Sequence, residues 1–247
     1  MANFGNTEKQ YHIDCSEEDV GRYVLLPGSP DRVPLIASFL ENAKECARKR
    51  EYLTYTGFIN GTKVSVTSTG IGGPSTAIAV EELAKIGADT FIRVGTSGIM
   101  QNDMRPGDLI VATAAIRDEG TSHQYLPAAF PAVAHPDVVQ AFIRACQKRN
   151  MTHHIGVVHS KDSFYGEVES ARMPMKRHLE ERWQCWIDGG ALCSEMEAAT
   201  LFVVSSFLRK RAGAIMMAGG THYSVEELCR TAVQGIRELI ERDTQRP

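Results

Sequence analysis

Two kinds of hydrophobic pattern alternate along the chain. Short apolar runs rich in β-branched and aromatic residues predict strands, and longer segments with apolar residues at helical spacing predict helices. The expected strands are Tyr23–Leu26, Tyr52–Ile59, Thr62–Thr69, Thr90–Val94, Asp108–Ala115, Ile155–His159 and Ala212–Met217. The expected helices are Pro30–Leu40, Pro74–Ile86, Pro136–Arg149, Met175–Trp186, Glu195–Leu208 and Val225–Arg242.

The alternation of the two patterns predicts the fold class. Strands that alternate with helices indicate a layered α/β domain with a mostly parallel or mixed sheet. Three of the expected helices open on a proline, which suits the first helical position because its missing N–H costs nothing there. The 247 residues contain no low-complexity linker and no internal repeat, so we expect one domain over residues 1–247.

Composition and charge exclude several classes of protein. Hydrophobic residues make up 43% and charged residues 23%, which is ordinary for a globular protein. A net charge of -3 gives no reason to expect nucleic acid or a membrane as a partner. No apolar run is long enough to cross a bilayer, and the polar start of the chain lacks a signal-peptide core. The 6 cysteines form no C-x-x-C pair, so we expect reduced thiols, no zinc site and a cytoplasmic location.

Candidate chemistry should lie in the loops that follow the strands, because ligands of α/β sheets bind beyond the carboxyl ends of the strands. The segment STGIGGPSTAIAVEEL, residues 68–83, follows one of them. Its glycines allow backbone conformations closed to other residues, and Pro74 opens a helix. A helix start with free N–H groups can hold an anion or the edge of a ligand. The alternative is a tightly packed turn without a ligand.

Two arginines point to a bound anion. Arg32 stands in the first turn of a predicted helix, where the helix dipole disfavours a cation. Arg93 lies inside an apolar strand, where an unpaired charge would be costly. Phosphate suits both, because guanidinium groups match its oxygens and the segment 96–98 (TSG) adds hydroxyl and N–H groups. For Arg32, a surface ion pair with Asp31 or another acid is an equally good interpretation as a bound anion. For Arg93 we favour phosphate over a structural pair with a carboxylate.

Two further segments carry candidate binding residues. In SKDSFYGEVESARMP, Phe164 and Tyr165 could stack on a planar ring, and Glu167 or Arg172 could read its polar edge. The alternative is an exposed loop with an aromatic anchor. In SEMEAAT, residues 194–200, one glutamate could hold paired sugar hydroxyls. The structural alternative is a capping box, because Ser194 and Glu197 have the spacing for it.

Five segments in order resemble the nucleoside phosphorylase family, and within it most closely the bacterial uridine phosphorylases. They are PGSPDRV, STGIGGPSTAIAVEEL, RVGTSG, DSFYG and SEMEAAT, and the similarity runs from His12 to about Met217. The resemblance implies a three-layer α/β/α domain with a central mixed sheet, of the phosphorylase/hydrolase-like type. It also implies a pentosyltransferase that splits uridine with phosphate, reversibly, into uracil and ribose 1-phosphate. Phosphate is then a co-substrate, and no metal or organic cofactor is required.

The same resemblance implies a set of site residues. Phosphate would be held by Gly28, Arg32, Arg50, Arg93 and Thr96; ribose by His12, Glu195, Met196 and Glu197; and the base by Phe164, Glu167 and Arg172, with Arg93, Thr96 and Glu197 as the catalytic residues. The family also implies a homo-oligomer of dimers, expected to be a hexamer, in which His12 and Arg50 reach into the neighbouring site. A monovalent cation such as potassium would lie between subunits at Glu51, Ile71 and Ser75.

Two departures from the family leave the base open. Uridine phosphorylases usually have glutamine where this chain has Glu167, and an ionised glutamate can only accept hydrogen bonds. Glu167 is then protonated, turned away, or matched to a base other than uracil. The segment after Met217 (AGGTHYSVEEL) is shorter than in the family, and His222 is the only candidate there to replace its polar residue, although a surface role is the safer interpretation.

Three alternatives to uridine phosphorolysis remain open. They are a purine nucleoside phosphorylase, a nucleosidase that uses water, and a nucleoside-binding relative without catalysis. Arg32, Arg50 and Arg93 argue against the nucleosidase, because hydrolysis needs no cradle for a phosphate anion.

Overall fold

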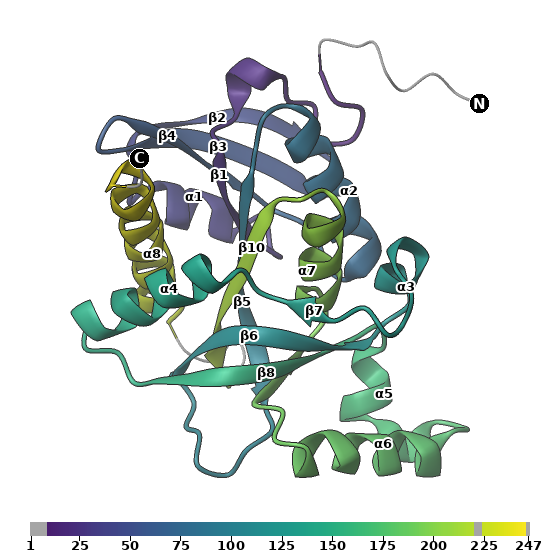
Figure 1. Ribbon diagram of the computed structural model, residues 1–247. Coiled ribbons are helices and arrows are strands. Elements are labelled where there is room, and N and C mark those ends of the chain that lie inside the picture. The colour runs from purple at the N-terminus through teal and green to yellow at the C-terminus, as the bar shows by residue number, and fades with distance from the viewer. Residues whose placement is uncertain (1–8, 220–223, 246–247) are drawn as a thin grey trace.

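The computed structural model describes residues 9–219 and 224–245, which fold into three layers (Figure 1). A mixed sheet forms the centre, and helices cover both of its faces. One face carries α1 (Arg32–Ala37), α4 (Pro136–Lys148) and α8 (Glu226–Gln245). The other face carries α2 (Gly73–Lys85), α3 (Thr121–Tyr125) and α7 (Ala198–Phe207). The expected α/β/α arrangement is therefore confirmed.

Within the described residues the sheet has ten strands. They are β1 (Tyr23–Pro27), β2 (Glu41–Lys49), β3 (Tyr52–Ile59), β4 (Thr62–Thr67), β5 (Thr90–Ile99), β6 (Leu109–Asp118), β7 (Ala132–Val133), β8 (His153–Lys161), β9 (Cys193–Glu195) and β10 (Arg211–Ala218). The order is β10-β6-β8-β9-β5-β1-β4-β3-β2, with β7 beside β6. Because β10 also pairs with β5, the strands β5, β10, β6, β8 and β9 close into a ring, and the remaining strands extend from it.

The central strands are apolar because they are covered on both faces. All five residues of β1 are buried, and its two neighbours β4 and β5 run parallel to it. Buried side chains form two hydrophobic clusters, one packed against α2 and α7 and the other against α1, α4 and α8. This parallel core fixes where the carboxyl ends of the strands meet.

The loops predicted to carry the chemistry lie side by side at that edge. The N–H of Thr69 donates to the carbonyl of Pro27 at 2.9 Å, and the N–H of Gly70 donates to the carbonyl of Gly28 at 3.0 Å. On β5, Arg93 is in register with Leu26 of β1 on one side and with Ala214 of β10 on the other. Segments far apart in the sequence thus share one end of the sheet.

Several predicted elements differ from the structure. The polar run of β2 (ENAKECARK) gave no hydrophobic signal, because β2 is an exposed edge strand. The short elements α3, α5 (Phe164–Val168), β7 and β9 were also missed, and α6 extends over Lys176–Asp188. Two 3₁₀ turns lie at Glu17–Asp19 and Ser170–Arg172. No helix in the described ranges is long and apolar enough to cross a membrane.

The expected helix from Glu195 to Leu208 was wrong at its start. Glu195 ends β9, and the helix begins only at Ala198. The Glu195 carboxylate accepts the N–H of Glu197 at 2.8 Å and the N–H of Ala198 at 3.0 Å. Glu195, and not Ser194, therefore provides the acceptors for this helix start, and the predicted capping box is absent.

Candidate functional site

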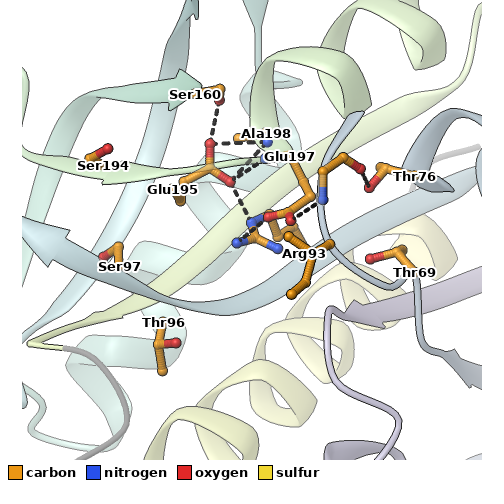
Figure 2. Close-up of polar contacts among 12 residues, drawn as sticks. Thr69, Thr76, Arg93, Thr96, Ser97, Ser160, Ser194, Glu195, Glu197 and Ala198 are labelled. Carbon is orange, nitrogen blue, oxygen red and sulfur yellow. Dashed lines mark hydrogen bonds and ion pairs between the residues drawn. The ribbon is translucent and has the colours of Figure 1, made fainter. Parts of the chain in front are cut away.

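The centre of the site is an arginine enclosed by two carboxylates (Figure 2). Arg93 is 6% exposed; its Nε lies 2.6 Å from Oε2 of Glu195, and its Nη2 lies 2.6 Å from Oε2 of Glu197. The contact at Nε is an ion pair without the alignment of a hydrogen bond. Burial by itself lowers the pKa of Arg93, but the charges of Glu197 and Glu195 outweigh it and raise the pKa. The carboxylate alternative for Arg93 is therefore what the structure shows, and a contact with phosphate stays a prediction.

Local sequence explains why the guanidinium fits between these acids. A Cβ on Gly95 would lie 2.8 Å from Nη2 of Arg93, so the glycine leaves the space that the side chain occupies. Glu195 is held by the two helix N–H groups and by the hydroxyl of Ser160, which donates to Oε1. With the contact to Arg93, both oxygens of Glu195 are engaged, so this carboxylate has one fixed position.

Glu197 connects the arginine to the glycine-rich segment. It is the N-cap residue of α7 and 4% exposed, and its Oε1 accepts the N–H of Gly72 at 2.6 Å. Burial raises the pKa of Glu197; the charge of Arg93 opposes this, and that of Glu195 adds to it. Gly72 has φ 92°, a conformation that favours glycine. The turn at residues 68–83 thus directs one of its N–H groups at a carboxylate of the same chain.

A second arginine faces the same edge. Arg32 is the first residue of α1, and its Nη2 donates to the Thr96 hydroxyl at 3.2 Å. Burial lowers the pKa of Arg32, and the charge of Arg93 lowers it further, with a small opposing effect of Glu197. Within the described residues Arg32 forms no ion pair with Asp31, and the N–H of Asp31 donates to the Ser29 hydroxyl at 3.2 Å. Arg32, Thr96, Arg93 and Glu197 therefore lie together at this edge of the sheet, and their roles in binding stay predictions.

The predicted base reader Glu167 lies in a different group of contacts. Glu167, on α5, forms an ion pair with Lys161 at the end of β8. Oε2 of Glu167 also accepts the Ser194 hydroxyl at 2.7 Å, and Ser194 Oγ lies 2.6 Å from Lys161 Nζ. The charge of an ionised Glu167 is thus balanced by a lysine that is 7% exposed. None of the three hypotheses for Glu167 included a neighbouring cation, which Lys161 supplies; the choice among a protonated Glu167, a Glu167 turned away and a base other than uracil stays a prediction.

A cavity of about 420 Å³ lies beside this group. Its walls come mainly from β8, α5 and α6, and its apolar part includes Leu179, Trp183 and Trp186. The lining residues are Asp118, His159, Lys161, Asp162, Ser163, Gly166, Glu167, Ser170, Leu179, Glu180, Arg182, Trp183, Gln184 and Trp186. Burial lowers the pKa of His159 to about 4, and the charge of Lys161 adds to this effect. His159 is therefore neutral at pH 7, and its ring contacts Ser194 Oγ and Asp118.

The other two predicted base-binding residues, Phe164 and Arg172, differ in their position relative to Glu167. Arg172 forms an ion pair with Glu169 on the surface, and its guanidinium packs 5.4 Å from the Tyr165 ring. Phe164 is 52% exposed, with its ring 5.9 Å from Lys161 Nζ. The structure therefore brings Phe164 near the Lys161–Glu167 pair but gives Arg172 a different partner.

His12 and Arg50, which we expect to act in a neighbouring subunit, have no polar contact, within the described part of the chain, with the two arginines of the site above. His12 is anchored to α2, because Nδ1 lies 2.6 Å from Oε1 of Glu82 and its N–H donates to the same carboxylate. Arg50 is exposed in the turn between β2 and β3, with φ 54°. Within residues 9–219 and 224–245, neither residue has a hydrogen bond or an ion pair to Arg93 or Arg32. Their roles in a second site stay predictions.

The three residues predicted to hold a cation do gather around Gly70. A Cβ on Gly70 would meet Cγ of Glu51 at 2.9 Å and Oγ of Ser75 at 3.4 Å. Ser75 Oγ donates to the carbonyl of Ile71 at 3.3 Å, and Ile71 is 77% exposed. In the part of the chain that the structure describes, no cluster of three His, Cys, Asp or Glu side chains could hold a metal ion.

Sequence reasoning missed Lys161, Ser194 and Ser160 as parts of the site. The sequence did contain a signal for Lys161: it is a charged residue at the end of a strand, just as Arg93 is a charged residue within one. Ser194 was interpreted as a cap, and only the fold shows that its hydroxyl joins Lys161 to Glu167. The shortened segment after Met217 includes His222, which lies outside the described residues.

Comparisons with known proteins show similarity over most of the chain. A model of the phosphorylase superfamily matches residues 22–242. A uridine phosphorylase of Treponema pallidum is 44% identical over 98% of this chain and 98% of its own length. A uridine phosphorylase of Thermococcus kodakarensis is 49% identical over 83% of this chain and 75% of its own length. A guanosine phosphorylase of Halorubrum lacusprofundi is 39% identical over 86% of this chain and 83% of its own length.

Proposed function

This chain belongs to the phosphorylase superfamily, and on that premise we propose that it is a uridine phosphorylase. The enzyme would be a pentosyltransferase that converts uridine and phosphate into uracil and ribose 1-phosphate. The observation that carries the proposal is the placement of Arg32, Thr96 and Arg93 at one edge of the sheet, beside the carboxylate of Glu197. This edge offers cationic donors for an anion next to an acceptor for hydroxyl groups.

Phosphate would bind among Gly28, Arg32, Arg93 and Thr96. Two cationic side chains face two carboxylates, Glu195 and Glu197, so the protein's own charges nearly cancel before phosphate binds. Arg93 is therefore not free to neutralise phosphate completely, and the anion keeps charge for the reaction. That charge, held beside the sugar carbon, would stabilise the positive charge that develops there when the glycosidic bond breaks.

Ribose would be held by Glu197 and Met196, with His12 of a neighbouring subunit near the 5′-hydroxyl. Among the described residues, Oε1 of Glu197 is bound by the N–H of Gly72 and Oε2 by Arg93, which leaves a lone pair on each oxygen to accept from ribose hydroxyls. Each oxygen of Glu195, by contrast, has more than one partner, so its contacts favour a positioning role. A direct contact of Glu195 with ribose stays a prediction.

Assembly and location are further parts of the proposal. We expect dimers, assembled into a hexamer, in which His12 and Arg50 complete the neighbouring site. A potassium ion would lie between subunits at Glu51, Ile71 and Ser75, and the high exposure of Ile71 leaves this face open to a second chain. The six cysteines, all within the described ranges, carry free thiols, which suits the reducing cytoplasm.

A phosphate-dependence assay tests the proposal. The enzyme is incubated with uridine, inosine or adenosine, with and without phosphate, and the free base is measured. We expect uracil release only with phosphate; release without phosphate would show a nucleosidase, and no release from any nucleoside would favour a binding protein. Preferred release of hypoxanthine would instead indicate a purine nucleoside phosphorylase.

One variant tests the anion site directly. Arg32→Met should raise the KM for phosphate about 10-fold to 100-fold with a smaller effect on the KM for uridine, because it removes a charge-assisted donor. Arg177→Met is the matched control, since Arg177 has a side chain that is 92% exposed on α6. Equal KM values for phosphate in the two variants would contradict the assignment of Arg32.

A further inference from the structure

Glu82 on α2 is a buried carboxylate that binds a segment near the start of the chain. It is 7% exposed, and the segment lies beside α2 (Figure 1). Oε2 of Glu82 accepts the N–H of His12 at 2.9 Å and the N–H of Ile13 at 2.9 Å, and Oε1 lies 2.6 Å from Nδ1 of His12. Three N–H groups from two neighbouring residues thus compensate the burial of one carboxylate.

The contact with Glu82 determines which ring nitrogen of His12 carries the proton. Because an ionised carboxylate only accepts hydrogen bonds, Nδ1 has to be the N–H donor of the ring. In the neutral imidazole Nε2 is then the acceptor. Within the described residues Nε2 has no hydrogen bond, and the side chain of His12 is 29% exposed. The ring therefore presents one acceptor to a ligand from outside these contacts.

The segment that carries His12 has a second anchor, at the end of β2. Nζ of Lys49 donates to the carbonyl of Tyr11 at 2.5 Å and lies 5.1 Å from the centre of the Tyr11 ring. The N–H of Gln10 donates to the carbonyl of Cys15 at 2.8 Å, which closes the segment into a turn. The backbone of the segment is thus held at several points. Arg50 follows Lys49 directly, so the two residues proposed to act in a neighbouring subunit belong to one connected piece of the structure.

His12 lies away from the predicted ribose site of its own chain. Glu82 follows Gly73, the first residue of α2, by nine positions. A rise of 1.5 Å per residue places Glu82 about 14 Å along the helix from the glycine-rich turn. The carboxylate of Glu197, which we expect to hold ribose, contacts that turn. This separation supports the proposed role of His12 in the site of a neighbouring subunit.

Resting on the proposed function, we propose that Glu82 is a positioning residue that selects nucleosides with a free 5′-hydroxyl group in the neighbouring subunit's site. Glu82 holds the proton of His12 on Nδ1, so Nε2 accepts the hydrogen of the 5′-hydroxyl. In Glu82→Gln the side chain has a single acceptor oxygen, and its amide N–H groups would face N–H donors. The ring of His12 then loses its fixed orientation and tautomer, and the contact with the 5′-hydroxyl is lost.

Two substrates that differ only at C5′ test the inference. We expect Glu82→Gln to lower kcat/KM for uridine about 10-fold, mostly through KM, and to change kcat/KM for 5′-deoxyuridine less than about 2-fold. A purely structural role of Glu82 would lower both values equally, so an unchanged ratio of the two substrates would overturn the inference. Glu181→Gln is the matched control; it lies on the exposed face of α6, paired with Arg177 at 2.7 Å, and should keep the wild-type ratio. Where inosine is cleaved instead of uridine, the pair is inosine and 5′-deoxyinosine.

A double variant shows whether Glu82 acts through His12. His12→Ala should lose the same preference for the 5′-hydroxyl, and in this background Glu82→Gln should reduce the preference no further. Thermal unfolding checks that each variant is folded, which we expect because Lys49 still holds the carbonyl of Tyr11. A further loss of the preference in the double variant would contradict an action through His12.

Binding without turnover separates this inference from the proposed function. Calorimetry without phosphate compares the affinities of the same pair of nucleosides. We expect the wild type to bind the nucleoside with the 5′-hydroxyl at least about 10-fold more tightly, and Glu82→Gln to lose that preference. Equal binding of both nucleosides by the wild type, or binding of neither, would overturn the inference even if uridine is cleaved. A preference that depends on Glu82, without cleavage of any nucleoside, would support the inference and refute the proposed function.

Discussion

Arg93 Nη2 lies 2.6 Å from Oε2 of Glu197, and the other oxygen of the same carboxylate accepts the N–H of Gly72. This contact ties β5, the start of α7 and the glycine-rich turn before α2 to one point (Figure 2). Glu195 binds the same guanidinium from the end of β9. Arg93 therefore determines the relative positions of the segments that would surround a nucleoside.

Loss of Arg93 should destabilise the protein strongly. Arg93→Met leaves Glu195 and Glu197 buried without their cation, which costs about 3–5 kcal/mol when one partner of a buried pair is removed. Arg22→Met is the control, because the pair of Arg22 with Asp89 is largely exposed and contributes about 0–1 kcal/mol. Urea unfolding of both variants measures the difference in the free energy of unfolding. Similar losses in the two variants would mean that the Arg93 cluster does not stabilise the fold.

The glycine-rich turn should not tolerate a side chain at Gly73. A Cβ there would lie 2.6 Å from Oγ1 of both Thr121 and Thr200, so Gly73→Ala forces α2, α3 and α7 apart. We expect a loss of about 1–3 kcal/mol in the free energy of unfolding. Gly120→Ala is the control, since its Cβ would have only an ordinary contact, at 3.5 Å from Asp162. A Gly73→Ala variant as stable as Gly120→Ala would show that the helices can shift at no cost.

His159 should make stability depend on pH. Burial, followed by the charge of Lys161, lowers its pKa from 6.5 to about 4. Between these values the unfolded chain binds a proton that the native ring does not, so stability falls as the pH drops from about 6.5 to 4 and is complete above 6.5. The shift corresponds to about 3 kcal/mol.

Unfolding in urea between pH 7 and pH 4.5 checks this contribution. The wild type should lose more stability than His159→Asn over this range, because the asparagine side chain does not titrate. The groups that face the ring are Asp118, Lys161, Ser194, Trp183 and Trp186. A constant difference between wild type and variant across the range would refute the assignment to His159.

Sharing of Arg50 between subunits can be tested by complementation. Arg50→Ala and Arg32→Ala should each abolish most of the activity. If Arg50 completes the site of a neighbour, a mixed dimer has one site with both defects and one intact site. Co-expression of the two variants should then restore about a quarter of the wild-type activity. Activity no higher than that of either variant alone would place both arginines in the same subunit's site.

The hydrophobic pattern predicted the buried helices and strands well, because buried positions require apolar residues. The strand Tyr52–Ile59 matches β3 at both ends, and the helix over Pro136–Arg149 differs from α4 by its last residue. The pattern failed for β2, whose side chains face solvent, and for β9, which has three residues. Backbone hydrogen bonds hold β2 to β3 and β9 to β5 and β8, and such bonds do not depend on side-chain type.

The sequence by itself determined the α/β class, the edge of the sheet where the site lies and the family. It also showed that Arg93 needs a counter-charge, because desolvation of an arginine in an apolar strand follows from its neighbours in the chain. Only the tertiary structure decided which groups supply that charge, since Glu195 and Glu197 reach Arg93 through β9 and the start of α7. It likewise decided that Glu167 meets Lys161 through Ser194, a contact that depends on how β8, α5 and β9 pack. Pairing energies depend on distance and burial in three dimensions, and neither quantity is encoded in local spacing.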